Sequence, residues 1–189
     1  MYSAFIFALI ATAFARPQSS PSQGQCQKVN NVKQTYFGFP DNSPPGAGIA
    51  YPQCGRQLAG GTGTYADPLT LATANGELNT CEVVYSYHLR KYLRHEDDCE
   101  ACGDDWTQGI WHVDVWVGSS YQNGGQDQIN CEDTLTVGNQ ILLRNPPSNL
   151  PVDSECFPFL QFQMEGRKSA CSIFYTSSST FDVDRMLIM

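Results

Sequence analysis

The chain has 189 residues, eight cysteines and a formal net charge of −8, with 19 acidic against 11 basic side chains. Without a basic cluster, this acidic balance argues against binding to nucleic acid or to an anionic membrane surface. The length suits one domain with a hydrophobic core. No phosphate or dinucleotide motif is present, so we expect no cofactor. We also expect a monomer, and the acidic charge suits a neutral or cationic partner.

The N-terminal segment, residues 1–15, resembles a signal peptide. It has no charged side chain, an apolar run from Ala4 to Ala11, and the small-x-small sequence Ala13-Phe14-Ala15. The run is shorter than the roughly 20 residues that span a bilayer. We therefore expect a secreted, extracellular protein, with an uncleaved anchor or a buried helix as the alternative.

The eight cysteines all follow residue 15. An even number in an exported chain predicts disulfide bonds, although the sequence leaves their connectivity open. Zinc is the competing interpretation. It is disfavoured because Cys99 and Cys102 form the single CxxC pair and the three histidines lack zinc-type spacing.

The remaining chain divides into three parts. Residues 16–25 form a polar leader that we expect to be disordered, and residues 26–152 form the folded domain. Residues 153–189 form an extension whose structure the sequence does not predict. Short alternating segments separated by Gly and Pro predict a mainly β domain, a barrel or a sandwich, with strands at Cys81–Tyr85, Tyr92–Arg94 and Ile110–Val117. A short helical turn is expected within Ser86–His95.

The clearest strand places Val113 and Val115 on one face and His112, Asp114 and Trp116 on the other. A carboxylate among large apolar residues must be paired, hydrogen-bonded, or raised in pKa. A carboxyl of raised pKa suits a general acid. The alternation is equally compatible with a solvent-facing edge strand.

Two other aspartates draw attention. Asp97 precedes Cys99-Glu100-Ala101-Cys102, where a disulfide would fix the acidic loop, although a solvated acidic loop is the simpler interpretation. Asp67 precedes Pro68 and is also explained by turn chemistry.

Three motifs in order, Ala66-Asp67-Pro68, Glu96-Asp97-Asp98 and Val113-Asp114-Val115, resemble the three-aspartate signature of 3D domains. These are double-psi β-barrels of bacterial cell-wall proteins and lytic murein transglycosylases. Thr35-Tyr36-Phe37-Gly38 is similar to the opening strand motif of expansins. His112-Val113-Asp114 resembles the His-Phe-Asp motif that expansins share with barrel endoglucanases.

The resemblance covers about Thr35 to Gly118 and implies a six-stranded double-psi β-barrel with disulfide-stapled loops and few short helices. It also implies a polysaccharide substrate and a glycosidase or lytic activity with catalytic residues Asp114, Asp97 and Asp67. The sequence departs from the family pattern in two places. The second carboxylate of the endoglucanases has only the displaced counterpart Asp41, and a cysteine loop replaces a Gly-rich stretch.

Sugar rings stack on aromatic faces. We therefore expect substrate contacts from Tyr36, Tyr65, Trp116 and His112, with burial in the core as the alternative for most of the aromatic rings. From the cysteine and histidine spacing we expect no bound metal. The competing hypothesis is a non-catalytic secreted protein that binds glycan in the manner of expansins or acts as an effector.

Overall fold

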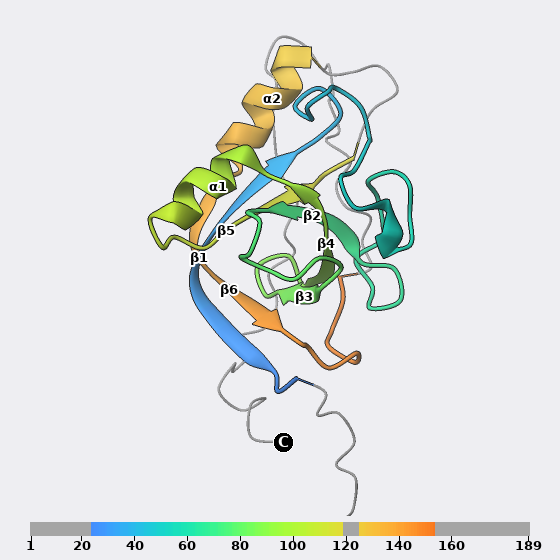
Figure 1. Cartoon of the computed structure of the whole chain (residues 1–189), viewed down its shortest axis with the longest axis vertical. Coiled ribbons are helices and arrows are strands. Elements are labelled where there is room, and N and C mark those ends of the chain that lie inside the picture. Colours follow the sequence, from blue (N-terminus) through green and yellow to red (C-terminus); the bar gives the residue numbers. More distant parts are fainter. Residues whose placement is uncertain (1–23, 119–124, 154–189) are drawn as a thin grey trace, which may run out of the picture.

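The computed structural model describes residues 24–118 and 125–153. The expected signal peptide lies outside these ranges. So do almost all of the expected leader and of the expected C-terminal extension. The described residues are mainly β and form a closed barrel of six strands with two short helices (Figure 1). None of the described helices is long and apolar enough to cross a membrane.

The barrel strands follow the order β1-β5-β2-β4-β3-β6, with β6 closing onto β1. Their bounds are Gln27–Phe37 (β1), Leu69–Thr73 (β2), Val83–Ser86 (β3), Lys91–Asp98 (β4), His112–Trp116 (β5) and Val137–Arg144 (β6). The pairs β1–β5 and β2–β4 are parallel, and the other four are antiparallel.

The two halves of the barrel have the same connectivity. Exchanging β1, β2 and β3 with β4, β5 and β6 leaves every neighbour and every strand orientation unchanged. The barrel therefore has a pseudo-twofold arrangement of strands that no internal sequence repeat reveals.

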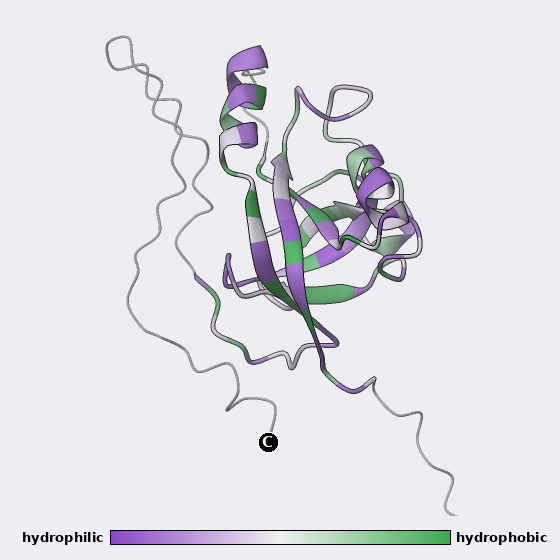
Figure 2. Ribbon diagram, turned by 90° about the vertical axis from the view of Figure 1, so that its left-hand side faces the viewer, coloured by the Kyte–Doolittle hydropathy of each residue, from purple (hydrophilic) through white to green (hydrophobic). Residues whose placement is uncertain are grey.

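The barrel interior is filled by apolar side chains from the strands. Hydrophobic and hydrophilic residues follow one another along the strands in Figure 2. Val113 and Val115 of β5 are fully buried there, as the predicted alternation requires. The core cluster also includes Val32, Tyr36, Leu69, Leu71, Val84, Leu93 and Leu142. The opposite face of β5, which carries Asp114, points away from this core.

Helices and disulfides support the barrel from outside. Helix α1 (Glu100–Thr107) packs beside β5 and β2, α2 (Gly125–Thr134) packs on β1, and a 3-10 turn spans Pro52–Cys54 (Figure 1). Two disulfides lie within the described residues, Cys54–Cys81 and Cys99–Cys102. The second lies within the loop that follows Asp97 and Asp98, where a disulfide was one of the open pairings.

One local expectation was wrong. Residues 87–90 make the turn of the antiparallel β3–β4 hairpin, and strand β4 begins at Lys91. This turn is not helical, whereas the strand expected at Tyr92–Arg94 is present within β4, where Tyr92 and Leu93 pair with Tyr85 and Val84.

Candidate functional site

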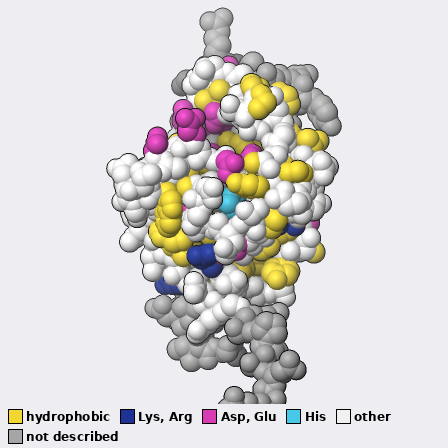
Figure 3. Space-filling model, viewed as in Figure 1, with side chains coloured by type: hydrophobic (Ala, Val, Ile, Leu, Met, Phe, Trp, Pro, Cys, Tyr) yellow, Lys and Arg dark blue, Asp and Glu magenta, His cyan; other side chains and the backbone are white. Residues whose placement is uncertain are grey.

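A groove of about 1030 Å³ runs along the outside of the barrel. Its walls are the connection after β1, residues 41–50, and the beginning of α1, while Phe37 and Ala72 contribute from the strands. The charged residues that line it are all acidic: Asp41, Asp97, Asp98, Glu100, Asp104 and Asp114. In Figure 3, acidic side chains gather in the upper half of the face and the basic ones lie lower.

Asp114 lines this groove from β5, which pairs in parallel with β1. Their register sets Thr35 opposite Asp114, and the Thr35 hydroxyl donates to Oδ1 of Asp114 at 2.7 Å. Burial of the carboxyl raises the pKa of Asp114 to about 7, against the lowering effect of the Thr35 hydrogen bond, and the charge of Asp41 raises it further. The residue remains partly exposed in the groove, so an incoming molecule can reach a carboxyl that is about half protonated near pH 7.

Asp97 lines the same groove from the end of β4. Its Oδ1 accepts the backbone N–H of Ala50 at 2.9 Å and that of Asp98 at 3.0 Å. Burial nevertheless raises the pKa of Asp97. The Cys99–Cys102 disulfide follows directly and fixes the backbone at this wall of the groove.

Asp41, which the sequence placed off the family pattern, also lines the groove. Burial raises the pKa of its carboxyl, with a further contribution from Asp133. The structure therefore brings Asp41 and Asp97 into the groove of Asp114.

Glu132 of α2 is an acidic residue that sequence reasoning missed. It is 1% exposed, and its Oε1 accepts from Nε2 of Gln128 at 2.8 Å, while Oε2 has no hydrogen-bond partner among the described residues. Burial raises its pKa to about 8, and the charges of Asp41 and Asp114 contribute. Gly38 permits this approach, because a Cβ there would lie 2.5 Å from Oε1 of Glu132.

Asp67 is not among the residues that line the groove. It caps its own turn, accepting the backbone N–H of Thr62 at 2.9 Å, and pairs with Arg56 at 2.8 Å. Arg56 in turn lies 3.2 Å from the fully buried carboxylate of Glu96. The aspartate of the first motif therefore belongs to a structural charge network, and the structure does not bring it together with Asp97 and Asp114.

The expected substrate-binding side chains lie elsewhere than the groove lining. Tyr36 is 3% exposed within the barrel core, and Trp116 is 4% exposed behind Phe37, to which it packs edge-on. Tyr65 is 46% exposed but contacts Tyr92 near the start of β4, at the other end of that strand from Asp97. These positions do not support direct sugar contacts from Tyr36, Trp116 or Tyr65 in the groove.

His112 is 1% exposed and is also unavailable to a ligand in the groove. Its Nε2 lies 2.9 Å from the Thr35 hydroxyl. Its Nδ1 lies 2.8 Å from Oδ2 of Asp105, an ion-pair distance without the geometry of a hydrogen bond. Burial lowers the pKa of His112, and the nearby Lys33 charge contributes. His112, two residues before Asp114 in the motif, therefore contacts the Thr35 hydroxyl that binds Asp114 and does not itself face the groove.

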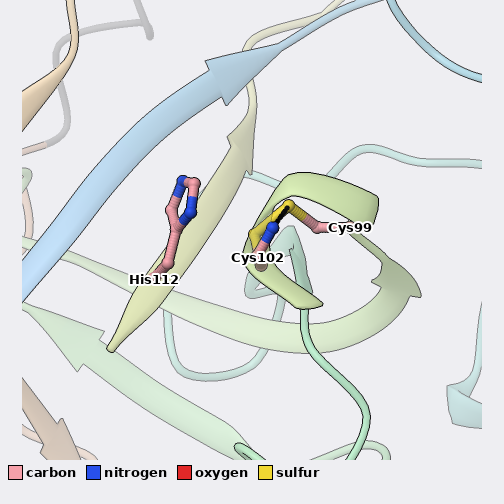
Figure 4. Close-up of side chains that lie close together, drawn as sticks. All are labelled: Cys99, Cys102 and His112. Atoms are coloured by element: carbon pink, nitrogen blue, oxygen red, sulfur yellow. Dashed lines mark hydrogen bonds between the residues drawn. A yellow bond between two sulfur atoms is a disulfide. The ribbon is translucent and has the colours of Figure 1, made fainter. Parts of the chain in front are cut away.

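The ring of His112 also lies beside the Cys99–Cys102 disulfide (Figure 4). Ligand atoms of these three residues are within 4.8 Å of one another, a separation suited to a metal ion. The two sulfurs are bonded to each other, and a metal requires thiolates. In its disulfide form the cluster is a structural support of α1 against β5.

Fold and site together define a small, disulfide-containing six-stranded β-barrel with an acidic groove on its outer surface. The chain belongs to the family described as the DDB_G0273701 N-terminal domain, whose model matches residues 29–172. It is 37% identical over 134 residues to the uncharacterized protein DDB_G0273701/DDB_G0273221 of Dictyostelium discoideum, which covers 70% of this chain. The matched part spans 58% of the length of that relative. No solved structure matches the chain significantly.

Proposed function

We propose that the protein is secreted and cleaves glycosidic bonds of a cell-wall polysaccharide, with Asp114 as the general acid. The observation that carries the proposal is a groove-facing carboxyl whose pKa is raised to about 7. General acids work best when their pKa lies near the working pH, because the protonated form is then populated and the proton is readily given up.

The strand order supports a finer statement about the fold. We propose that the barrel is of the double-psi type, because its two halves have the same connectivity and each contributes one member to both parallel pairs. The order of its acidic motifs along the chain, which resembles that of 3D domains, supports the same assignment.

A second carboxylate decides which reaction follows. Inverting hydrolysis needs a base about 6.5–9.5 Å from the acid, with a water between them. Asp41 and Asp97 share the groove with Asp114, and in the proposal one of these two carboxylates is the base. A lytic route, in which a hydroxyl of the sugar attacks, needs Asp114 alone.

The test incubates the full mature protein with insoluble peptidoglycan, cellulose and chitin and measures released sugars by mass spectrometry. Hydrolysis and the lytic route differ by one water in product mass. The proposal expects Asp114→Asn to reduce release at least 100-fold, the usual size of a general-acid contribution. The matched control, Asp127→Asn, removes an exposed charge on α2 and should leave release unchanged. Release that survives Asp114→Asn contradicts the role of Asp114.

A second candidate function is binding without cleavage, and the sign of the groove favours a cationic partner for it. Six acidic residues and no basic residue line the groove, so a glycan with free amino groups is the best complement. The discriminating measurement is binding to deacetylated and acetylated chitin at low and high salt. Salt-sensitive binding to the deacetylated polymer, without sugar release, supports this function in place of the first.

A further inference from the structure

A row of polar side chains extends behind Asp114, on the outer faces of β1 and β5. Parallel pairing sets Lys33 opposite His112 and Thr35 opposite Asp114. The contacts run from Nζ of Lys33 to Oδ2 of Asp105 at 2.9 Å, from that Oδ2 to Nδ1 of His112 at 2.8 Å, and from Nε2 of His112 to Oγ1 of Thr35 at 2.9 Å. Thr35 then reaches Oδ1 of Asp114 at 2.7 Å.

The Thr35 hydroxyl restricts the protonation of its two neighbours, because a hydroxyl has one hydrogen and lies between two partners. If Thr35 donates to an ionised Asp114, then His112 must donate to Thr35 and carry a proton on Nε2. If His112 is neutral with its hydrogen on Nδ1, facing Asp105, then Thr35 donates to Nε2 and Asp114 must donate to Thr35.

We propose that Thr35 relays a proton between Asp114 and His112, so that the two residues hold one proton in common. In the transfer, the O–H bond of Asp114 breaks as a new O–H bond forms on Thr35, and the original Thr35 O–H bond breaks as an N–H bond forms on Nε2. Neutral Asp114 and neutral His112 thereby become a carboxylate and an imidazolium, with no change in total charge. Asp105 faces the imidazolium, and His112 acts as a positioning residue for the acid.

The surrounding charges determine where the shared proton lies. Burial lowers the pKa of His112 and raises that of Asp114, so the proton resides mainly on Asp114. Groups from every neighbouring element affect this balance: Lys33 on β1, Asp105 on α1, Glu77 after β2, which accepts the His112 backbone N–H at 2.6 Å, Asp41 after β1, and Glu132 on α2. The inference deepens the proposed function but requires no glycan cleavage for its test.

The experiment follows the His112 ring by NMR titration in the full mature protein, with and without Asp114→Asn. In the wild-type background, the substitution removes the carboxylate that accompanies the His112 imidazolium. We therefore expect the His112 midpoint to fall by about one pH unit. In a Thr35→Val background, which keeps the shape but removes the hydroxyl, the same substitution should produce no measurable shift.

Two further variants separate the relay from other effects. Thr35→Ser keeps the hydroxyl and should retain the shift, while Thr136→Val makes the same chemical change at an exposed site and should also retain it. A shift of equal size in the Thr35→Val background would mean that the coupling passes through space, and that result overturns the relay. No shift in the wild-type background overturns it as well. Loss of glycan cleavage in the earlier assay, or its absence, affects neither outcome.

Discussion

The raised pKa of Asp114 makes a quantitative prediction about stability. A carboxyl with a pKa of 3.8 in the unfolded chain and about 7 in the folded protein binds its proton more tightly when folded. Its contribution to stability is therefore fully present below pH 3.8 and is lost as the pH rises through about 7. The two values differ by about three pH units, which corresponds to roughly 4 kcal/mol as an upper limit.

Asp114→Asn removes this titration while keeping the size of the side chain. The variant should match the wild type in free energy of unfolding near pH 4 and exceed it at pH 8, by up to about 4 kcal/mol. Urea unfolding of both proteins at intervals from pH 4 to pH 8, with the disulfides intact, measures the difference. Other groups titrate in both proteins, so the difference isolates position 114.

The control for this comparison is Asp127→Asn, whose difference from the wild type should stay constant over the same pH range, because the side chain is exposed on α2. A wild-type curve that runs parallel to that of Asp114→Asn from pH 4 to pH 8 refutes the reasoning. It would mean that the groove leaves the carboxyl with an ordinary affinity for protons.

Three further predictions concern Glu132, the two disulfides and Asp67. Glu132→Gln should increase the free energy of unfolding above pH 8 and not near pH 4.5, because burial raises the pKa of Glu132 to about 8. Urea unfolding at several pH values tests this, and a pH dependence equal to that of the wild type contradicts it. Replacing both cysteines of Cys54–Cys81, which are 27 residues apart, by alanine should cost about 3.5 kcal/mol, and replacing those of Cys99–Cys102, which are 3 apart, about 1.5 kcal/mol. Thermal unfolding measures both, and equal losses would show that loop length does not set the effect. Asp67→Asn should cost about 1 kcal/mol of stability through its cap and its contact with Arg56, yet leave sugar release intact; loss of release in a folded variant would return Asp67 to the site.

Local periodicity predicted the parts of the fold that depend on neighbouring residues. The alternation in β5 placed Val113 and Val115 on one face and Asp114 on the other; in the structure the two valines lie in the core and Asp114 lines the groove. The mainly β class with disulfide-stapled loops and few short helices is also confirmed. These features follow from side-chain alternation and from cysteine use, which short stretches of sequence contain.

Features that depend on pairing between distant strands were not predictable in this way. The contact between Thr35 and Asp114 exists because β1 pairs in parallel with β5, a register that neither strand specifies alone. Glu132 approaches the site because α2 packs on β1 beside Gly38, the residue after this strand, and a glutamate in a polar helix gives no signal of that.

Aromatic residues misled the sequence interpretation for a related reason. Tyr36 alternates with outward-facing residues on β1 and therefore points into the barrel, while Trp116 shares the face of Asp114 but is covered by its neighbours around Phe37. Facing outward from a barrel is a property of the strand, whereas exposure depends on the loops and helices that pack over it. The three-aspartate pattern likewise does not show which aspartates reach the groove. Asp67 caps a turn, whereas Asp97 lines the groove.

The central claim is that burial raises the pKa of Asp114 to about 7 while the carboxyl faces an open groove. Its most direct test is the pH titration of the Asp114 carboxyl carbon by NMR in the purified protein, assigned by comparison with Asp114→Asn. The account predicts a main midpoint near pH 7, as burial among protein groups requires. A midpoint below about pH 5, close to that of an ordinary aspartate, would contradict it.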